Sequence, residues 1–212
     1  MKGSDIASFD IYPACHEHPE VAGKLWMVAD GVTRLRKWAG DDRLVWNCIE
    51  CTHINNPEAK ATPQQVKAEV WMSLVRGSRG IIYFVHEFKP KFVEAGLLAD
   101  AEMLSAVTAV NKQIHELAPV LNSPTVIDGV SVESAKAEAP VEAIVKRREG
   151  EVYVFAVGMR GAETTATFKV AGLSGTATAE VLGEGRNLDV REGTFRDEFR
   201  AWDVHLYRIR LQ

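Results

Sequence analysis

Short apolar runs alternate with amphipathic segments through the first 122 residues of the chain. The runs at 6–13, 44–50 and 80–88 predict three strands, and the last is apolar on both faces, as buried parallel strands are. Between and after them, apolar residues recur three and four positions apart, which predicts helices at about 21–35, 62–77 and 100–121. Strands joined by whole helices cannot form tight hairpins, so we expect them to pair in parallel.

The second helix has a clear start signal. Thr62 can cap the helix, Pro63 suits its first position, and Gln65 completes a capping box with Thr62.

From about residue 125 onward the pattern changes to short alternating runs separated by glycine turns. A spacing of about ten residues between such runs is typical of an antiparallel sandwich or small barrel, and we expect a β-sandwich. The junction is placed in LNSPTVIDG (121–129), because Pro124 cannot continue a helix. We therefore predict an α/β domain at 1–124 and an all-β domain at 125–212.

Composition excludes several classes of protein. The 212 residues carry a net charge of −4 with no Lys/Arg-rich run, so nucleic acid is not an expected partner. No apolar run approaches the roughly 20 residues of a membrane helix, so no membrane partner is expected. The N-terminus lacks the apolar core of a signal peptide, which predicts a cytoplasmic chain as written, or a secreted one if an upstream segment carries a signal.

Three cysteines do not make a disulfide framework. Cys48 and Cys51 lie three residues apart on a predicted strand, so they point to opposite faces and cannot share a metal ion. We interpret both as small buried hydrophobes, and His16 and His18 as solvated loop residues. No metal and no cofactor are predicted.

Each of the three predicted strands ends in polar residues. The first ends with Asp10 and Tyr12, the second with Glu50 before His53, Asn55 and Asn56, and the third with His86 and Glu87. In parallel α/β folds the carboxyl ends of the strands carry function. Glu50 stands out because a charge that ends a buried strand is costly without a partner or a role. The alternative interpretation is a salt bridge from Glu50 to Arg79 or Arg43.

The order of these motifs resembles the C-terminal part of clan A glycoside hydrolases, TIM-barrel enzymes that include β-galactosidases and cellulase-like hydrolases. DIASFDIYP (5–13) is similar to the sixth strand of such barrels, and LVWNCIECTHINN (44–56) to the seventh, whose terminal glutamate is the nucleophile. The stretch 61–88 is similar to the seventh helix and eighth strand, and the region after LAPVLNSP (117–124) to the small C-terminal sandwich of these enzymes.

The resemblance implies a partial (β/α)8 barrel, about strands six to eight with their helices, followed by a β-sandwich. It implies retaining hydrolysis of O-glycosidic bonds with Glu50 as nucleophile. The polar residues at the other strand ends would bind a carbohydrate substrate: Asp10, Tyr12, His53, Asn55, Asn56, His86 and Glu87. Phe84 and Phe88 share the parity of His86, so an aromatic platform under a sugar is a further possibility.

The family's acid/base carboxylate follows the fourth strand, and this chain has no such strand. Three parallel strands cannot close a barrel, so the missing strands would belong to a longer gene product, to another chain, or to a second copy in a self-associated half-barrel. The alternative function is a non-catalytic carbohydrate-binding module, or an inert module derived from a hydrolase.

Overall fold

We describe residues 4–40 and 42–210 of a computed structural model. The chain forms two compact units, residues 1–111 and 112–212, and helix α4 (Ala101–Leu121) spans the division between them. The predicted domain boundary at residue 124 stays a prediction.

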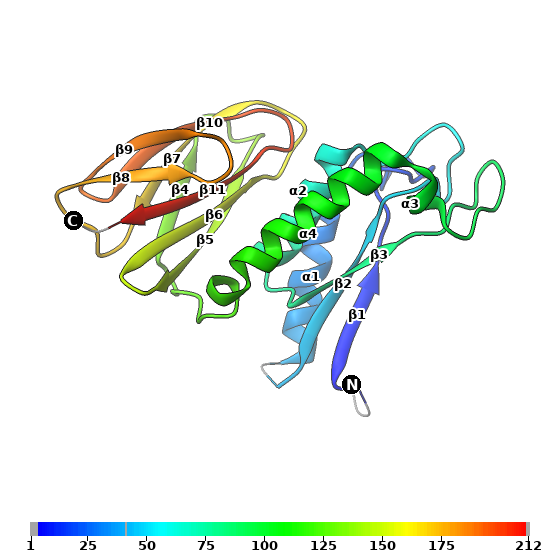
Figure 1. The fold of residues 1–212 in the computed structure, drawn as a ribbon, viewed down its shortest axis with the longest axis horizontal. Helices are drawn as coiled ribbons and strands as arrows, with labels where there is room; N and C mark the ends of the chain where they lie inside the picture. Colours follow the sequence, from blue (N-terminus) through cyan, green and yellow to red (C-terminus); the bar gives the residue numbers. More distant parts are fainter. Residues whose placement is uncertain (1–3, 41, 211–212) are drawn as a thin grey trace. The chain divides into compact units, whose positions relative to one another are not determined.

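The first unit is built on a three-stranded parallel sheet in the order β1-β2-β3 (Figure 1). The strands are β1 (Ile6–Asp10), β2 (Leu44–Glu50) and β3 (Gly80–Phe84), joined by α1 (Trp26–Ala39) and α2 (Pro63–Val75). A short helix, α3 (Gly96–Ala99), precedes α4. The prediction of parallel strands with helical crossovers is therefore confirmed, and Thr62 and Gln65 form the predicted capping box at the start of α2.

Two of the predicted elements have different bounds. Helix α1 begins at Trp26 rather than near Val21, because Gly23 adopts a positive φ of 73° and donates its N–H to the Pro13 carbonyl 2.8 Å away. Strand β3 ends at Phe84 rather than Phe88, because its last partner on β2 is Glu50. His86 and Glu87 therefore lie in a loop and not on a strand.

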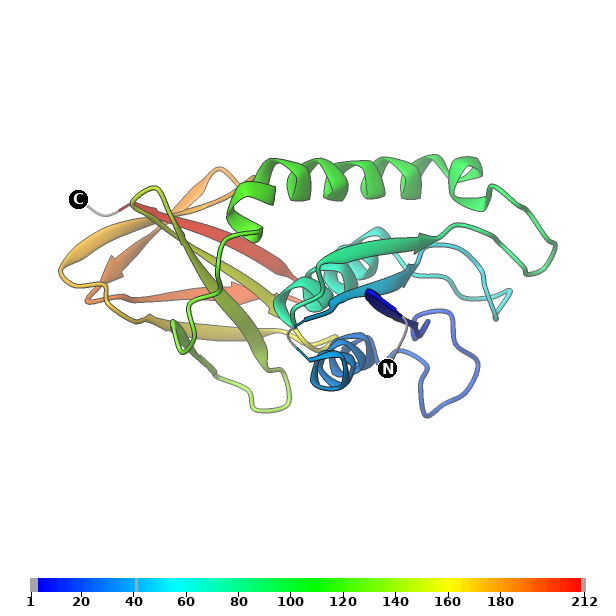
Figure 2. The same cartoon turned by 90° about the horizontal axis from the view of Figure 1, so that it is seen from below.

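Helices α1 and α2 pack against the sheet on one face, as Figure 2 shows. The core between α1 and the sheet contains Ala7 and Val45 from the strands and Val32, Leu35 and Ala39 from the helix. On the helical side of β2, the Asn47 side chain donates a hydrogen bond to Ser73 of α2 over 2.9 Å.

The opposite face of the sheet keeps apolar side chains exposed. Leu44 is 49% exposed, Ile82 38% and Ile6 37%, although parallel sheets are normally covered on both faces. The described residues thus form an open sheet with two unpaired edges, not a closed barrel. The placement of these strands in an eight-stranded barrel is not shown.

The second unit is one antiparallel sheet of eight strands, in the order β4-β7-β10-β9-β8-β11-β6-β5. The strands are β4 (Val130–Ser134), β5 (Val141–Arg148), β6 (Glu151–Gly158), β7 (Thr164–Val170), β8 (Thr176–Val181), β9 (Arg186–Arg191), β10 (Thr194–Phe199) and β11 (Val204–Arg210).

The eight-stranded sheet curls until its two outer strands, β4 and β5, contact each other. It encloses a core in which the rings of Phe168 and Phe195 stack 4.7 Å apart beside Tyr207. The all-β prediction is confirmed, but the two-sheet sandwich is wrong in detail. The chain forms a single sheet that is nearly closed, because alternating strands of this length bury their apolar face by curling as well as by stacking.

No helix of the described residues is long and apolar enough to cross a membrane.

Candidate functional site

The carboxyl ends of the three parallel strands bring the predicted site residues to one edge of the sheet. In the pairing register Asp10 lies beside Cys48, and Glu50 lies beside Phe84. The loops that follow β1, β2 and β3 therefore start side by side, and each carries part of the predicted set.

Glu50 holds the loop after β1. Its side chain is fully buried, and its two carboxylate oxygens accept the backbone N–H groups of Ala14 (2.6 Å) and Cys15 (2.8 Å). Hydrogen bonds from two N–H groups stabilise a buried carboxylate. Arg43 instead donates to the carbonyls of Ser4 (3.0 Å) and Ala39 (3.2 Å), so the salt bridge from Glu50 to Arg43 is not formed.

Glu69 of α2 is the partner that the sequence analysis missed. It is also fully buried, and no N–H or O–H group of the described residues donates to either of its oxygens. Glu50 is the neighbouring carboxyl group that acts most on Glu69, and we infer that the two groups share a proton. A sequence signal existed: Val66, Glu69, Val70 and Ser73 share one helical face, so the glutamate lies in an otherwise core-facing stripe.

Burial determines the protonation of this carboxyl pair. It raises the pKa of Glu69 well above its ordinary range, and the neighbouring Glu50 charge raises it further. Burial also raises the pKa of Glu50, but the hydrogen bonds from the loop after β1 and from Glu69 oppose that shift. We infer that Glu69 keeps the proton and donates it to the Glu50 carboxylate.

The pair does not have the arrangement of a retaining glycosidase. In those enzymes the two carboxylates stand about 5 Å apart on either side of a sugar bond. Glu50 and Glu69 are neighbouring carboxyl groups that are both fully buried, which leaves no room for a sugar between them. The role of Glu50 as nucleophile stays a prediction, and its geometry in this structure is that of a buried anchor.

The cysteines around this pair are free thiols. Burial raises the pKa of Cys15 and of Cys51 to about 12, so neither forms a thiolate readily. The Cys51 thiol donates to the Phe84 carbonyl at 3.1 Å. Among the described residues no group of three His, Cys, Asp or Glu side chains is arranged to hold a metal ion.

Five rings gather beside the carboxyl pair, and we call them the aromatic cluster: Tyr12, Phe84, His86, Phe88 and Phe92. Ring centroids lie 5.2 Å apart for Tyr12 and Phe84, 5.8 Å for Phe84 and Phe88, and 5.5 Å for Phe88 and Phe92. The two outermost rings face solvent, with Phe88 45% and Phe92 56% exposed. Contiguous exposed aromatic surface of this kind is typical of a binding site.

The loops after β2 and β3 are hydrogen-bonded to each other beneath the cluster. The Thr52 hydroxyl donates to the His86 carbonyl (2.6 Å), and Phe88 donates its N–H to the His53 carbonyl (2.9 Å). The His53 ring is occupied within its own loop, with Nδ1 3.1 Å from the carbonyls of Asn56 and Ala59. These bonds fix the backbone that carries His86 and Phe88.

The remaining predicted residues divide into two groups. Asp10 is exposed and hydrogen-bonds Tyr12, whose pKa is raised first by burial and then by that carboxylate. Asn55 is exposed. The Asn56 side chain caps a turn by accepting the N–H of Glu58, and Glu87 pairs with Val93 through its backbone. Asp10 and Asn55 therefore face solvent, whereas Asn56 and Glu87 form contacts within their own loops.

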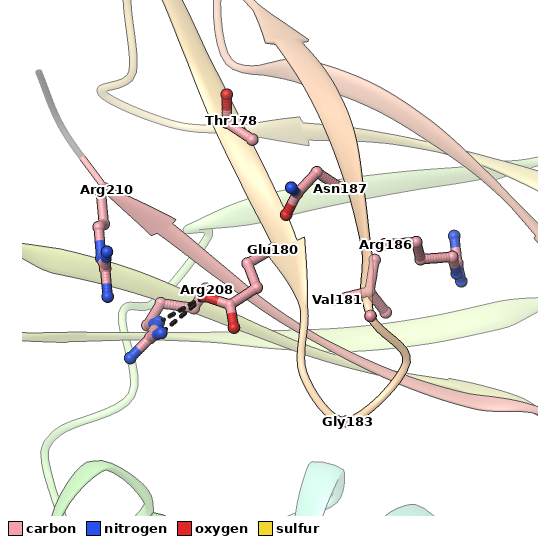
Figure 3. Close-up of a pocket in the computed structure, with 9 residues that line it drawn as sticks. Thr178, Glu180, Val181, Gly183, Arg186, Asn187, Arg208 and Arg210 are labelled. Carbon is pink, nitrogen blue, oxygen red and sulfur yellow. Dashed lines mark hydrogen bonds and ion pairs between the residues drawn. The ribbon is translucent and has the colours of Figure 1, made fainter.

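The second unit carries a polar groove of about 530 Å³ on the outer side of β8, β9 and β11 (Figure 3). Arg208 binds Glu180 there at 2.6 Å, and Arg210 binds Glu151 at 2.9 Å. Because each of these cations already has a carboxylate partner, we interpret the groove as a row of surface ion pairs and not as a ligand site.

A partly buried ionic network extends from Arg186, which lines this groove. Arg186 binds Asp197 with two hydrogen bonds of 2.7 and 2.8 Å, and the Tyr207 hydroxyl donates to the same carboxylate over 2.8 Å. The buried Asp197 carboxylate is stabilised by these three donors, so we interpret the network as structural.

Comparison with known proteins gives a likeness in fold alone. No protein-family model and no curated protein sequence matches the chain. Among solved structures, an alpha-amylase from Geobacillus thermoleovorans complexed with acarbose aligns with a TM-score of 0.58 and 12% identity over 89% of this chain and 47% of that one. AmyP in complex with maltose aligns with a TM-score of 0.57 and 8% identity over 95% and 54%. A GH30 endoxylanase from Clostridium papyrosolvens aligns with a TM-score of 0.52 and 12% identity over 98% and 49%.

These structural neighbours are glycoside hydrolases, and matches over most of the chain include large parts of both units. The chain spans about half the length of the solved structures that it matches.

Proposed function

We propose that this chain is part of a glycoside hydrolase-like protein and binds a carbohydrate on the aromatic cluster. The observation that carries the proposal is a contiguous, partly exposed group of rings at the carboxyl ends of three parallel strands. Ligands of parallel α/β folds bind at this edge of the sheet. The likeness to glycoside hydrolases supports the choice of carbohydrate as the ligand class.

The cluster suits a sugar for a physical reason. A pyranose ring presents apolar C–H groups on its faces and hydroxyl groups around its rim. Phe88 and Phe92 offer flat apolar surface to a sugar face. The exposed Asp10 carboxylate at the end of β1 and the exposed Asn55 amide on the loop after β2 supply polar groups for the hydroxyls.

The open face of the parallel sheet supports the wider assignment. Ile6, Leu44 and Ile82 are exposed on the face without helices. Further strands would pair with the edges of this sheet and close it over that face, as in a (β/α)8 barrel whose last three strands are β1, β2 and β3. In this proposal the remaining strands come from a longer gene product, from a partner chain or from a second copy. The assignment to clan A, with a β-galactosidase-like or cellulase-like enzyme as the source, belongs to the same proposal.

Retaining hydrolysis with Glu50 as nucleophile is the second candidate. It is favoured by the position of Glu50 at the carboxyl end of β2, beside the cluster residue Phe84. Since the carboxylate is fully buried, this function requires the loop containing Ala14 and Cys15 to move away and a second carboxylate from another segment.

The binding proposal is tested by calorimetric titration with maltotriose, the sugar in the structure of an AmyP variant, and with xylotriose. We expect Phe88→Ala and Phe92→Ala each to weaken binding about tenfold, since burying an aromatic face on a ligand contributes roughly 1–2 kcal/mol. Trp38→Ala is the matched control, because Trp38 is a 67% exposed aromatic residue on α1 and outside the cluster. Equal affinity in all three variants, or no binding by the wild type, would refute the proposal.

The catalytic candidate has its own test. Aryl glycosides are assayed with the wild type, Glu50→Gln and Glu69→Gln. Loss of turnover in Glu50→Gln with turnover retained in Glu69→Gln supports the nucleophile. Identical rates in Glu50→Gln and the wild type remove Glu50 from the mechanism.

A further inference from the structure

The imidazole of His86 belongs to the aromatic cluster, and one of its two nitrogens is hydrogen-bonded within the protein. Its Nδ1 is 2.6 Å from the carbonyl oxygen of Glu94. A carbonyl oxygen only accepts hydrogen bonds, so Nδ1 must carry the hydrogen and donate it. In the neutral ring the other nitrogen, Nε2, is then the one with a free lone pair.

The local backbone fixes this arrangement. Glu87 and Val93 exchange two backbone hydrogen bonds of 3.0 and 2.9 Å, which close the loop 87–93 and place the Glu94 carbonyl next to His86. A Cβ on Gly96 would lie 3.0 Å from the Val85 carbonyl oxygen, so the returning chain passes too close for any larger residue to fit easily. The Thr52 hydroxyl binds the His86 carbonyl from the neighbouring loop.

The surroundings of Nε2 are aromatic. The His86 ring centroid lies 5.9 Å from Phe84, 6.5 Å from Phe88 and 6.0 Å from Phe92. No described residue hydrogen-bonds Nε2. A hydrogen-bond acceptor without a protein partner among exposed rings is a recognition group for a ligand donor.

We propose that His86 is a specificity-determining residue whose Nε2 accepts a hydrogen bond from a hydroxyl of a sugar stacked on Phe88 and Phe92. This inference rests on the proposed function and adds the protein group that hydrogen-bonds a hydroxyl of the sugar. It assigns two different roles to the two nitrogens: Nδ1 orients the ring, and Nε2 contacts the ligand.

Amide side chains separate the two roles. Asparagine at position 86 places an amide where Nδ1 lies and can still donate to the Glu94 carbonyl, but offers no acceptor at the Nε2 position. Glutamine reaches the Nε2 position with its carbonyl oxygen and loses the bond to Glu94. Phenylalanine keeps the aromatic surface and removes both nitrogens.

Maltotriose and xylotriose are titrated into the wild type, His86→Asn, His86→Gln and His86→Phe at pH 8. We expect His86→Asn and His86→Phe to bind about tenfold more weakly and His86→Gln to stay within about threefold of the wild type, since a neutral hydrogen bond is worth about one factor of ten. If His86→Asn binds as the wild type does, or His86→Gln binds as weakly as His86→Phe, the inference is overturned.

A second measurement does not depend on the sugar. Nitrogen-15 NMR of the imidazoles in the free protein at pH 8 should show His86 with a protonated Nδ1 and an unprotonated Nε2. The opposite tautomer overturns the inference whatever binds. Loss of binding in the Phe88 and Phe92 variants with unchanged binding in every His86 variant would leave the proposed function intact and refute the role of His86 alone.

Discussion

Replacing Glu69 by glutamine should remove a pH dependence that the buried carboxyl pair imposes on the first unit. In the wild type Glu69 must hold a proton to donate to Glu50, because neither of its oxygens has another partner among the described residues. A glutamine amide donates the same hydrogen bond at every pH. The variant therefore keeps the contact and loses the titration.

The sign and size of the effect follow from linkage. The pKa of Glu69 is raised on folding above its ordinary value of 4.5, so the folded chain binds the proton more strongly than the unfolded chain does. The stabilising contribution is complete below pH 4.5 and is lost as the pH rises toward the folded-state pKa. One extra bound proton corresponds to a slope of about 1.4 kcal/mol per pH unit.

Carboxylates whose pKa is lowered on folding act in another window. Asp100 has a lowered pKa because of its bond to Lys60, so its contribution is lost only as the pH falls below its ordinary value of 3.8. The difference between Glu69→Gln and the wild type from pH 5 to 8 therefore isolates the contribution of Glu69, because every other titratable group is common to both proteins.

The assay is urea unfolding followed by tryptophan fluorescence, since four of the five tryptophans lie in residues 1–111. The difference in free energy of unfolding between Glu69→Gln and the wild type should grow by about 1.4 kcal/mol per pH unit above 4.5, until the folded-state pKa is passed. Glu58→Gln, at an exposed loop position, is the control and should follow the wild type. A wild-type stability that stays level or rises from pH 5 to 8, or a Glu69→Gln variant with the wild-type slope, would refute the shared proton.

Three further predictions concern packing and buried polar groups, and each is measured as the free energy of unfolding in urea. Glu50→Ala leaves the buried N–H groups of the loop after β1 without acceptors and should cost about 2–5 kcal/mol. Asp197→Ala removes the bidentate partner of the partly exposed Arg186 and the acceptor of the buried Tyr207 hydroxyl, and should cost about 1–3 kcal/mol, whereas exposed Asp189→Ala in the same unit should be nearly neutral. Gly31→Ala places a Cβ 2.1 Å from the Phe9 ring and should cost about 1–3 kcal/mol, whereas Ala at exposed Asp30 should not. Wild-type stability in any of these variants would contradict the corresponding contact.

The parallel part of the fold could be predicted because local signals and periodicity agree there. Thr62 and Gln65 form the capping box that their spacing indicates, and the apolar run at 44–50 is β2 residue for residue. The ends of α1 and β3 were less accessible to prediction. They depend on a loop bond from Gly23 to Pro13 and on where the neighbouring strand stops, which no local pattern contains.

The antiparallel unit was predicted in class but not in detail. The runs at 141–148, 151–159, 164–173, 176–185 and 202–211 predict five of its eight strands, and β4, β9 and β10 are not among them. Glu192 and Gly193 connect β9 to β10, and both have the positive φ that two-residue hairpin turns require. The glycine of this pair is the sequence signal for the turn. Whether alternating strands stack as two sheets or curl as one depends on pairing between distant strands, and alternation alone is the same in both cases.

At the candidate site too, the sequence predicts where a residue lies on its strand but not which distant residues contact it. A carboxylate that ends a buried parallel strand needs either a reaction or partners, and both possibilities give Glu50 the same sequence context. What separates them is access. The N–H groups of Ala14 and Cys15, 36 and 35 residues before Glu50, bind its carboxylate, and we infer that the protonated Glu69, 19 residues after it, does so too. The carboxylate is fully buried. His86 is the reverse case: its Nδ1 has a protein partner, and its Nε2 remains available among exposed rings. Chemistry at this edge of the sheet is therefore to be sought first where a polar atom meets solvent, and the anchored carboxyl pair is better understood as the support that holds the strand-end loops in place.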